Sequence, residues 1–146
     1  MTTMRPGGPE AADPKSGKEV EAIRTLVAQY AHHLLHGRGT EMAGLYAADG
    51  RFIVYKGSAT PVVNLTGREN IASQHKDMKA GSVFPLVTNH IVEVDGENAS
   101  GTCVMFCVRP SPEGSPGAPF YGEYKDQYVR IGGRWLFQER NFTYYS

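Results

Sequence analysis

The segment YAHHLLHG, residues 30–37, gathers three histidines and a tyrosine within eight residues. Histidine is the side chain whose ordinary pKa lies nearest to neutrality, so such a group suits proton transfer or metal binding. The chemistry depends on the helix face that each side chain occupies, because successive residues turn by about 100°. His32 and His36 fall opposite the apolar stripe centred on Val27, whereas His33 falls on its flank.

His32 and His36 have the H-x-x-x-H spacing of metal ligands, but position 33 is His where a zincin motif has Glu. We therefore expect no metal site here. Two solvated imidazoles near a helix C-terminus suit the helix dipole instead. His33 has two open interpretations. It points into a cavity beside the Tyr30 hydroxyl, or it is half-buried and bonded to a backbone carbonyl.

A second candidate for acid–base chemistry is His90, on a predicted strand. Alternation places one set of residues on a common face of that strand, namely Thr88, His90, Val92 and Val94. The charge of Glu93 marks the opposite face as the more exposed one, which turns His90 inward. His90 is then either a general acid or base or a core histidine with satisfied hydrogen bonds.

A third candidate is Asp126 in the stretch YGEYKDQYVR, where it shares a face with Tyr124 and Tyr128. If this face lines a cavity, the carboxylate is buried among aromatic rings. Burial raises the pKa of a carboxyl group and suits it to proton transfer. The alternative is a structural ion pair with Arg140 or Arg130.

Tyrosine is frequent in this chain, with eight residues. A phenol on a cavity wall can donate a hydrogen bond to a developing enolate oxygen. The two cysteines, Cys103 and Cys107, lie four residues apart in a predicted strand, about 13 Å along it. A disulfide needs Cα atoms within about 7 Å, so we expect two reduced core thiols.

The composition excludes several classes of protein. Fifteen basic and fifteen acidic residues give zero formal charge, which argues against a nucleic-acid binder. No apolar run approaches the roughly 20 residues that span a bilayer. The first 18 residues lack the hydrophobic segment of a signal peptide. We therefore expect a cytoplasmic protein that binds neither nucleic acid nor membrane.

The pattern of the chain predicts one folded domain, residues 19–146, after a disordered tail, residues 1–18, which holds three prolines and three glycines. Apolar spacings of three and four predict a helix from residue 19 to the glycines at 37 and 39. Further helices are predicted at 40–47 and 67–78, and strands at 51–56, 61–65, 83–94, 99–109, 120–131 and 134–144. Helices followed by a mainly antiparallel sheet define an α+β fold.

Five stretches, taken together and in this order, resemble a known family: VEAIRTLVAQYAHHLL, LYAADGRFIV, LTGRENIA, TNHIVEVDGENA and GEYKDQYVRIGGRWLFQER. They are similar to the SnoaL-like polyketide cyclases and dehydratases of the nuclear-transport-factor-two-like superfamily. The resemblance covers residues 19–140. It implies a conical barrel in which a curved antiparallel sheet wraps around the N-terminal helices and encloses an apolar pocket.

The resemblance carries over to the individual residues only in part. Relatives commonly place an Asp five residues after the first-helix Tyr, and a His four residues before the Asn of TNH. These positions are Leu35 and Pro85 here, so the usual acid–base pair is missing. The family positions that are kept are Tyr30, Asp49, Gly122, Tyr124, Asp126 and Arg140.

We therefore expect a cyclase of polyketide-type secondary metabolism that acts without a cofactor. It would close a ring by holding the substrate in a reactive conformation, by acid–base assistance, or by both. An isomerase or dehydratase and a non-catalytic binding or assembly module are the alternatives. The expected catalytic residues are His90, Asp126 and Tyr30. The expected partners are an apolar, oxygenated small molecule and a second copy of the chain. The expected substrate-binding residues are His33, Leu35, Asp49, Tyr55, Phe84, Tyr124, Tyr128, Trp135 and Arg140.

Overall fold

The N-terminal part of the chain is helical in the computed structural model, which describes residues 14–110 and 119–145. The helices are α1 (Pro14–Leu35), α2 (Gly39–Ala43) and α3 (Arg68–His75). Helix α1 buries the predicted apolar stripe, including Ile23, Val27 and Tyr30. It begins five residues before the predicted start, so residues 14–18 of the expected tail are helical. Residues 1–13 of that tail lie outside the described residues.

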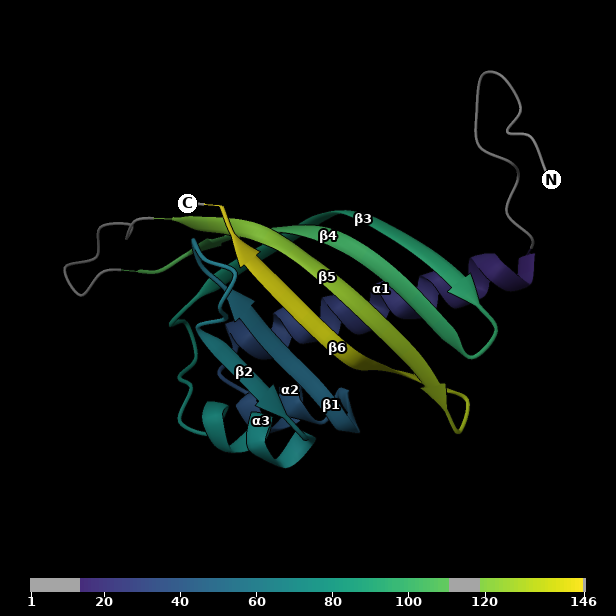
Figure 1. Ribbon diagram of the computed structural model, residues 1–146, viewed down its shortest axis with the longest axis horizontal. Coiled ribbons are helices and arrows are strands. Elements are labelled where there is room, and N and C mark those ends of the chain that lie inside the picture. The colour runs from purple at the N-terminus through teal and green to yellow at the C-terminus, as the bar shows by residue number, and fades with distance from the viewer. Residues whose placement is uncertain (1–13, 111–118, 146) are drawn as a thin grey trace, which may run out of the picture.

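Six strands form one sheet in the order β2-β1-β6-β5-β4-β3. They are β1 (Tyr46–Tyr55), β2 (Val63–Thr66), β3 (Phe84–Asp95), β4 (Asn98–Val108), β5 (Phe120–Ile131) and β6 (Arg134–Tyr144). Neighbouring strands pair antiparallel, except that β1 and β6 run parallel. The α+β class is confirmed. The sheet is strongly curved but open, with β2 and β3 at its edges (Figure 1).

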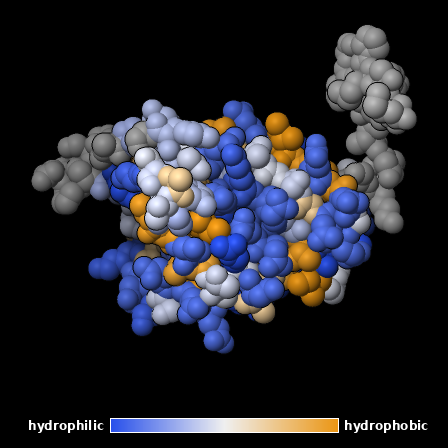
Figure 2. All heavy atoms as spheres, viewed as in Figure 1, coloured by the Kyte–Doolittle hydropathy of each residue, from blue (hydrophilic) through white to orange (hydrophobic). Residues whose placement is uncertain are grey.

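The sheet has two faces with different surroundings. Helix α1 runs along the inner face, behind the sheet as drawn in Figure 1, and contacts β3 and β6. Helix α3 packs on α2 and β1. Figure 2 gives the same view of the molecule, with hydrophilic residues over most of the visible surface and hydrophobic residues in separate groups. The core therefore lies between the inner face and the helices.

Strand β1 begins earlier than the sequence predicted. Tyr46 already pairs with Phe137 of β6, so the short helix α2 ends at Ala43 and not at residue 47. The buried Tyr46 ring lies 5.5 Å from the Phe137 ring, centroid to centroid. This packing outweighs the weak helical preference of a five-residue segment. Asp49 consequently lies within β1 and not at the end of a helix.

A bulge in β3 changes which residues face inward. Asn89 has φ of 56°, and the pairing of β3 with β4 shifts register between Thr88 and Ile91. The extra residue turns the strand, so that Val87 and His90 are partly buried while Thr88 is exposed. The expected common face of Thr88 and His90 is therefore wrong at Thr88. His90 faces inward as predicted.

The last hairpin follows the sequence closely. Gly132 and Gly133 have φ of 59° and 77°, the left-handed values that a two-residue hairpin turn of this type requires. The predicted bounds of β5 and β6 are confirmed. Cys103 and Cys107 are both buried free thiols, as expected. Within the described residues, no helix is long and apolar enough to cross a membrane.

Candidate functional site

Asp126 and Arg140 form an ion pair at the centre of the inner face. The two residues are direct partners on the adjacent strands β5 and β6, and alternation turns both side chains inward. Arg140 Nε lies 2.9 Å from Asp126 Oδ1, and Nη2 lies 3.1 Å from Oδ2. Both side chains are 0% exposed. The ion-pair interpretation of Asp126 is therefore the one that the structure shows.

Two further side chains extend this pair into a network. The Tyr128 hydroxyl donates to Asp126 Oδ2 at 2.9 Å, and His90 Nε2 lies 3.1 Å from the same hydroxyl. A hydroxyl has one proton, so His90 must donate its Nε2–H to the Tyr128 oxygen. Burial lowers the pKa of His90, which favours this neutral form. We call His90, Asp126, Tyr128 and Arg140 the buried network.

The guanidinium of Arg140 lies within an aromatic enclosure. Its central carbon is 3.5 Å from the ring centroid of Tyr124, 4.4 Å from that of Tyr30 and 4.5 Å from that of Phe137. Burial opposes the charge, but Asp126 and the neighbouring phenols keep the pKa of Arg140 well above its ordinary value. Because the Asp126 carboxylate is paired with this permanent cation, it is unsuited to abstract a proton from a substrate.

Tyr30 belongs to the packed core. Its hydroxyl shares a hydrogen bond of 3.1 Å with the Tyr46 hydroxyl. Burial raises the pKa of both phenols. The family position is therefore occupied by an uncharged phenol that already has a partner.

A pocket of about 230 Å³ opens beside the buried network, between α3 and the inner face of the sheet. We call it the inner pocket. Its walls are mostly apolar and aromatic: Leu34, Phe52, Val54, His75, Met78, Ser82, Val83, Met105, Cys107, Arg109, Phe120, Tyr124, Phe142 and Tyr144. Tyr124 belongs to both regions, since one side of its ring contacts Arg140 and the residue also lines the inner pocket.

Two side chains give the inner pocket acid–base and hydrogen-bonding capacity. His75 Nδ1 lies 2.7 Å from the carbonyl oxygen of Ile71, and a carbonyl only accepts. Nδ1 therefore carries the proton in the neutral ring, and Nε2 has a free lone pair. Burial raises the pKa of Tyr124 well above its ordinary value, although Arg140 opposes this. Tyr124 is thus a neutral hydrogen-bond donor.

His75 is a functional candidate that the sequence did not reveal. It is half-buried at the C-terminal end of α3, where its ring packs edge-on against the Phe52 ring, with the two centroids 5.6 Å apart. Its position depends on the close approach of α2 to α3, for which the sequence pattern gives no signal. A Cβ on Gly39 would lie 1.9 Å from the His75 carbonyl oxygen, so glycine is needed there.

The other expected binding residues lie outside the inner pocket. Trp135 is buried at the far end of the sheet, where its indole donates to the Glu19 carboxylate. Asp49 is exposed and accepts a hydrogen bond from Gln138 Nε2 at 3.2 Å. Phe84 is 52% exposed, and its neighbour Val83 lines the pocket instead.

Three more residues from the first helix and β1 are also absent from the pocket wall. Leu35 and Tyr55 are partly buried elsewhere. His33 is partly buried, and its Nδ1 has no hydrogen-bond partner in the described part of the chain. Burial lowers the pKa of His33. The sequence-based choice of binding residues therefore meets the inner pocket only at Tyr124.

The two exposed histidines at the end of α1 pack against each other. The rings of His32 and His36 are stacked, with centroids 6.2 Å apart. Among residues 14–110 and 119–145, no group of three or more His, Cys, Asp or Glu side chains is placed to hold a metal ion.

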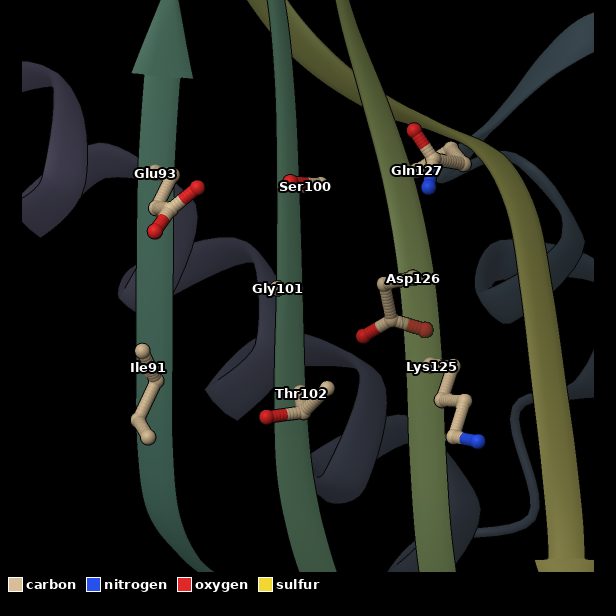
Figure 3. A pocket seen from close by; sticks show the side chains of 8 residues that line it. All are labelled: Ile91, Glu93, Ser100, Gly101, Thr102, Lys125, Asp126 and Gln127. Atoms are coloured by element: carbon tan, nitrogen blue, oxygen red, sulfur yellow. The ribbon is translucent and has the colours of Figure 1, made fainter.

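A second hollow, of about 340 Å³, lies on the outer face of the sheet. Figure 3 shows its polar side chains on three adjacent strands, with helix segments behind the sheet. They include Glu93 on β3, Thr102 on β4, and Lys125 and Gln127 on β5. The hollow is larger than the inner pocket, but Glu93, Lys125 and Gln127 are exposed side chains, so they act in a high dielectric. The inner pocket is the better candidate for chemistry.

The chain is similar in sequence pattern and in fold to several known proteins. A family model described as a SnoaL-like domain matches residues 17–141. A candidate scytalone dehydratase from Novosphingobium aromaticivorans is 22% identical, with a TM-score of 0.76 over 88% of this chain and 85% of that one. An NTF2-like protein with a cystatin-like fold from the same species is 21% identical, with a TM-score of 0.73 over 90% and 85%.

A hexachlorocyclohexane dehydrochlorinase, LinA type 2, is 17% identical, with a TM-score of 0.75 over 92% of this chain and 90% of that one. At these identities the similarity shows a shared fold. A search of curated protein sequences found no match.

Proposed function

Because the chain belongs to the SnoaL-like domain family, a family of small-molecule cyclases, dehydratases and isomerases, we propose that it is a cofactor-independent cyclase. Its substrate is an apolar, oxygenated small molecule held in the inner pocket. The observation that carries this proposal is the position of His75 and Tyr124 on the walls of one apolar cavity. One residue supplies a free imidazole lone pair, and the other supplies a neutral phenol.

The proposed roles follow from these two side chains. His75 Nε2 accepts a proton from a carbon next to a substrate carbonyl. The resulting enolate carbon attacks a second carbonyl carbon of the same molecule, the π bond of that carbonyl opens to an alkoxide, and the His75 imidazolium returns the proton to the alkoxide oxygen. The Tyr124 hydroxyl donates a hydrogen bond to the oxygen on which negative charge develops. The positive charge of the Arg140 guanidinium lies against the Tyr124 ring. It stabilises negative charge that develops on the Tyr124 oxygen, which makes this phenol a stronger hydrogen-bond donor. The pocket walls restrict the substrate to conformers in which ring closure is possible, an effect of up to roughly 7–11 kcal/mol in favourable cases.

The buried network has a supporting role in this proposal. Asp126 has both oxygens bonded and no exposure, so it holds Arg140 behind Tyr124 and does not meet the substrate. His90 is bonded to Tyr128 and does not line the inner pocket. The proposed catalytic residues are therefore His75 and Tyr124, in place of the expected pair His90 and Asp126.

A thermal-shift screen followed by turnover assays tests the function. The panel contains linear polyenes, tetramic acids, polyaromatic ketones, steroids and terpenes. A ligand at 100 times its dissociation constant stabilises the fold by about 2.7 kcal/mol, a shift of several degrees. Mass spectrometry then measures conversion of each hit. Hits that bind tightly but give no product at any pH would replace the cyclase with a non-catalytic binding module.

We also propose that the protein forms a homodimer through the outer face of the sheet. Leu86 and Phe106 are direct partners on β3 and β4 and are 64% and 39% exposed. Phe84 is exposed on the same edge strand. Exposed apolar groups on neighbouring strands favour association. Sedimentation analysis should give a dimer for the wild type and a monomer for Phe106→Glu, and a wild-type monomer would contradict this.

A further inference from the structure

Two cations lie over one aromatic pair in the wall of the inner pocket. The guanidinium carbon of Arg109 lies 4.5 Å from the ring centroid of Phe120, and Lys56 Nζ lies 5.2 Å from that of Tyr144. These two rings are 5.4 Å apart, and both line the pocket. Each cation is thereby held over the aromatic face of a residue that lines the pocket, and Arg109 itself belongs to the pocket wall.

The described surroundings leave these charges without a carboxylate. No Asp or Glu is among the described residues that line the inner pocket. The ion pairs found between described residues involve Arg51, Arg130 and Arg140, and none involves Lys56 or Arg109. A cavity with apolar walls concentrates the field of nearby charges. Two cations beside apolar walls favour an anion at this part of the pocket.

We propose that the inner pocket takes an organic anion with an apolar body. The rings or chain of this molecule fill the pocket, and its carboxylate or acidic enol is held by Lys56 and Arg109. The proposal rests on the proposed function for the use of this pocket as the substrate site, and it names the charge class of that substrate. Charge-assisted hydrogen bonds to Arg and Lys are stronger than neutral ones.

The competing interpretation is that both cations only cover the aromatic rings and remain solvated. A neutral molecule of the same shape would then bind as well as the anion. Matched probes separate the two: 2-naphthoate against 2-naphthamide, and benzoate against benzamide. Binding is measured by titration calorimetry with wild-type protein, Lys56→Gln, Arg109→Gln and the double variant. Lys125→Gln, which removes an exposed lysine from the outer face, is the matched control.

The anion proposal predicts that at least one acid binds wild-type protein roughly tenfold more tightly than its amide, since two exposed ion pairs contribute. The double variant should abolish this preference, each single variant should reduce it, and Lys125→Gln should leave it unchanged. Higher salt should weaken the acid and not the amide. Equal affinities for acid and amide, or binding of neither acid, would overturn the proposal.

A blocking variant separates this failure from failure of the proposed function. Ser82 is exposed and also lines the inner pocket, so Ser82→Trp should close it without disturbing the core. If acid and amide bind equally and Ser82→Trp weakens both, the anion preference is wrong and the pocket remains the binding site. If binding is unchanged in Ser82→Trp, the ligand lies elsewhere and both proposals fail.

Discussion

The inner face of the sheet carries polar groups in two adjoining regions with opposite surroundings. In the buried network, the acid, the base and the phenol are bonded to one another, and the Asp126 and Arg140 side chains are shielded from solvent. In the inner pocket, His75 and Tyr124 face a cavity with apolar walls. Charge is thus neutralised in the first region, and hydrogen-bonding capacity is left open in the second.

The difference shows why residue type is a poor guide to chemistry. Asp126 and His90 have the side chains of an acid–base pair, but the Asp126 carboxylate is bonded to Arg140 and Tyr128, and His90 Nε2 is bonded to the Tyr128 hydroxyl. His75 lies on a short polar helix, yet its free Nε2 atom belongs to a residue of the pocket wall. Four predictions test this division, and the first three compare a change in one region with a matched change elsewhere.

The largest effect is expected from Arg140→Met, which leaves the Asp126 carboxylate buried without its cation. Breaking a buried pair from one side costs about 3–5 kcal/mol, measurable as a lower midpoint of urea unfolding. Arg51→Met is the control, because Arg51 pairs with Glu139 at 3.2 Å on the exposed side and should cost below about 1 kcal/mol. Similar losses for the two variants would mean that the buried network is not the structural centre.

Gly39→Ala tests the packing that positions His75. The new Cβ would meet the backbone of α3 at 1.9 Å, so α2 and α3 must separate at a cost of about 1–3 kcal/mol. Ligand affinity of the inner pocket should fall with it. Gly17→Ala makes the same chemical change within α1 with nothing within 4 Å, and it should stabilise by up to about 1 kcal/mol. If Gly39→Ala left the free energy of unfolding unchanged, the tight contact between α2 and α3 would be contradicted.

Two tyrosine-to-phenylalanine changes compare the regions directly. Tyr128→Phe removes the hydroxyl that joins His90 to Asp126 and should cost about 1–3 kcal/mol of stability. Tyr124→Phe should change stability by less than about 1 kcal/mol, because the structure gives its hydroxyl no partner among the described residues. It should lower kcat by roughly 10²–10³. The reverse pattern, with turnover lost only in Tyr128→Phe, would place the chemistry in the buried network.

The smallest effect concerns pH. Burial holds the pKa of His90 below the ordinary value of 6.5, so the unfolded state binds its proton at higher pH than the folded state. The contribution of His90 to the free energy of unfolding is fully present above pH 6.5. It is lost as the pH falls through the pKa that His90 has in the folded state. Urea unfolding between pH 7.5 and about pH 5 should show this loss. His90→Gln should reduce the slope, and an unchanged slope would place the cause elsewhere.

The sequence predicted the elements whose pattern is local. Strands β5 and β6 follow from strict alternation and from the two glycines of their turn, and the inward position of Asp126 follows from the same alternation. The start of β1 could not be predicted in this way, because Tyr46 is fixed by its contact with Phe137 on the last strand. The bulge at Asn89 was missed because nothing in the local pattern marks an inserted residue.

The site was less predictable than the fold, because it depends on which partners meet. Asp126 left two interpretations open, and the cross-strand register with Arg140 decided between them. His75 lines the pocket because α2 and α3 pack together. The sequences of two short polar helices do not predict this packing. The cations Lys56 and Arg109 lie over neighbouring rings because Phe120 and Tyr144 come together from adjacent strands.

The parallel pairing of β1 with β6 has a consequence for biosynthesis. The order β2-β1-β6-β5-β4-β3 makes the last strand the bridge between two halves of the sheet. During translation, the unit of α2, α3, β1 and β2 cannot join β3, β4 and β5 until residues 134–144 leave the ribosome. Until then, each half exposes an unpaired strand edge that can associate with other chains. A chain that stops before β6 should therefore be a target for chaperones, with neither half able to complete the core.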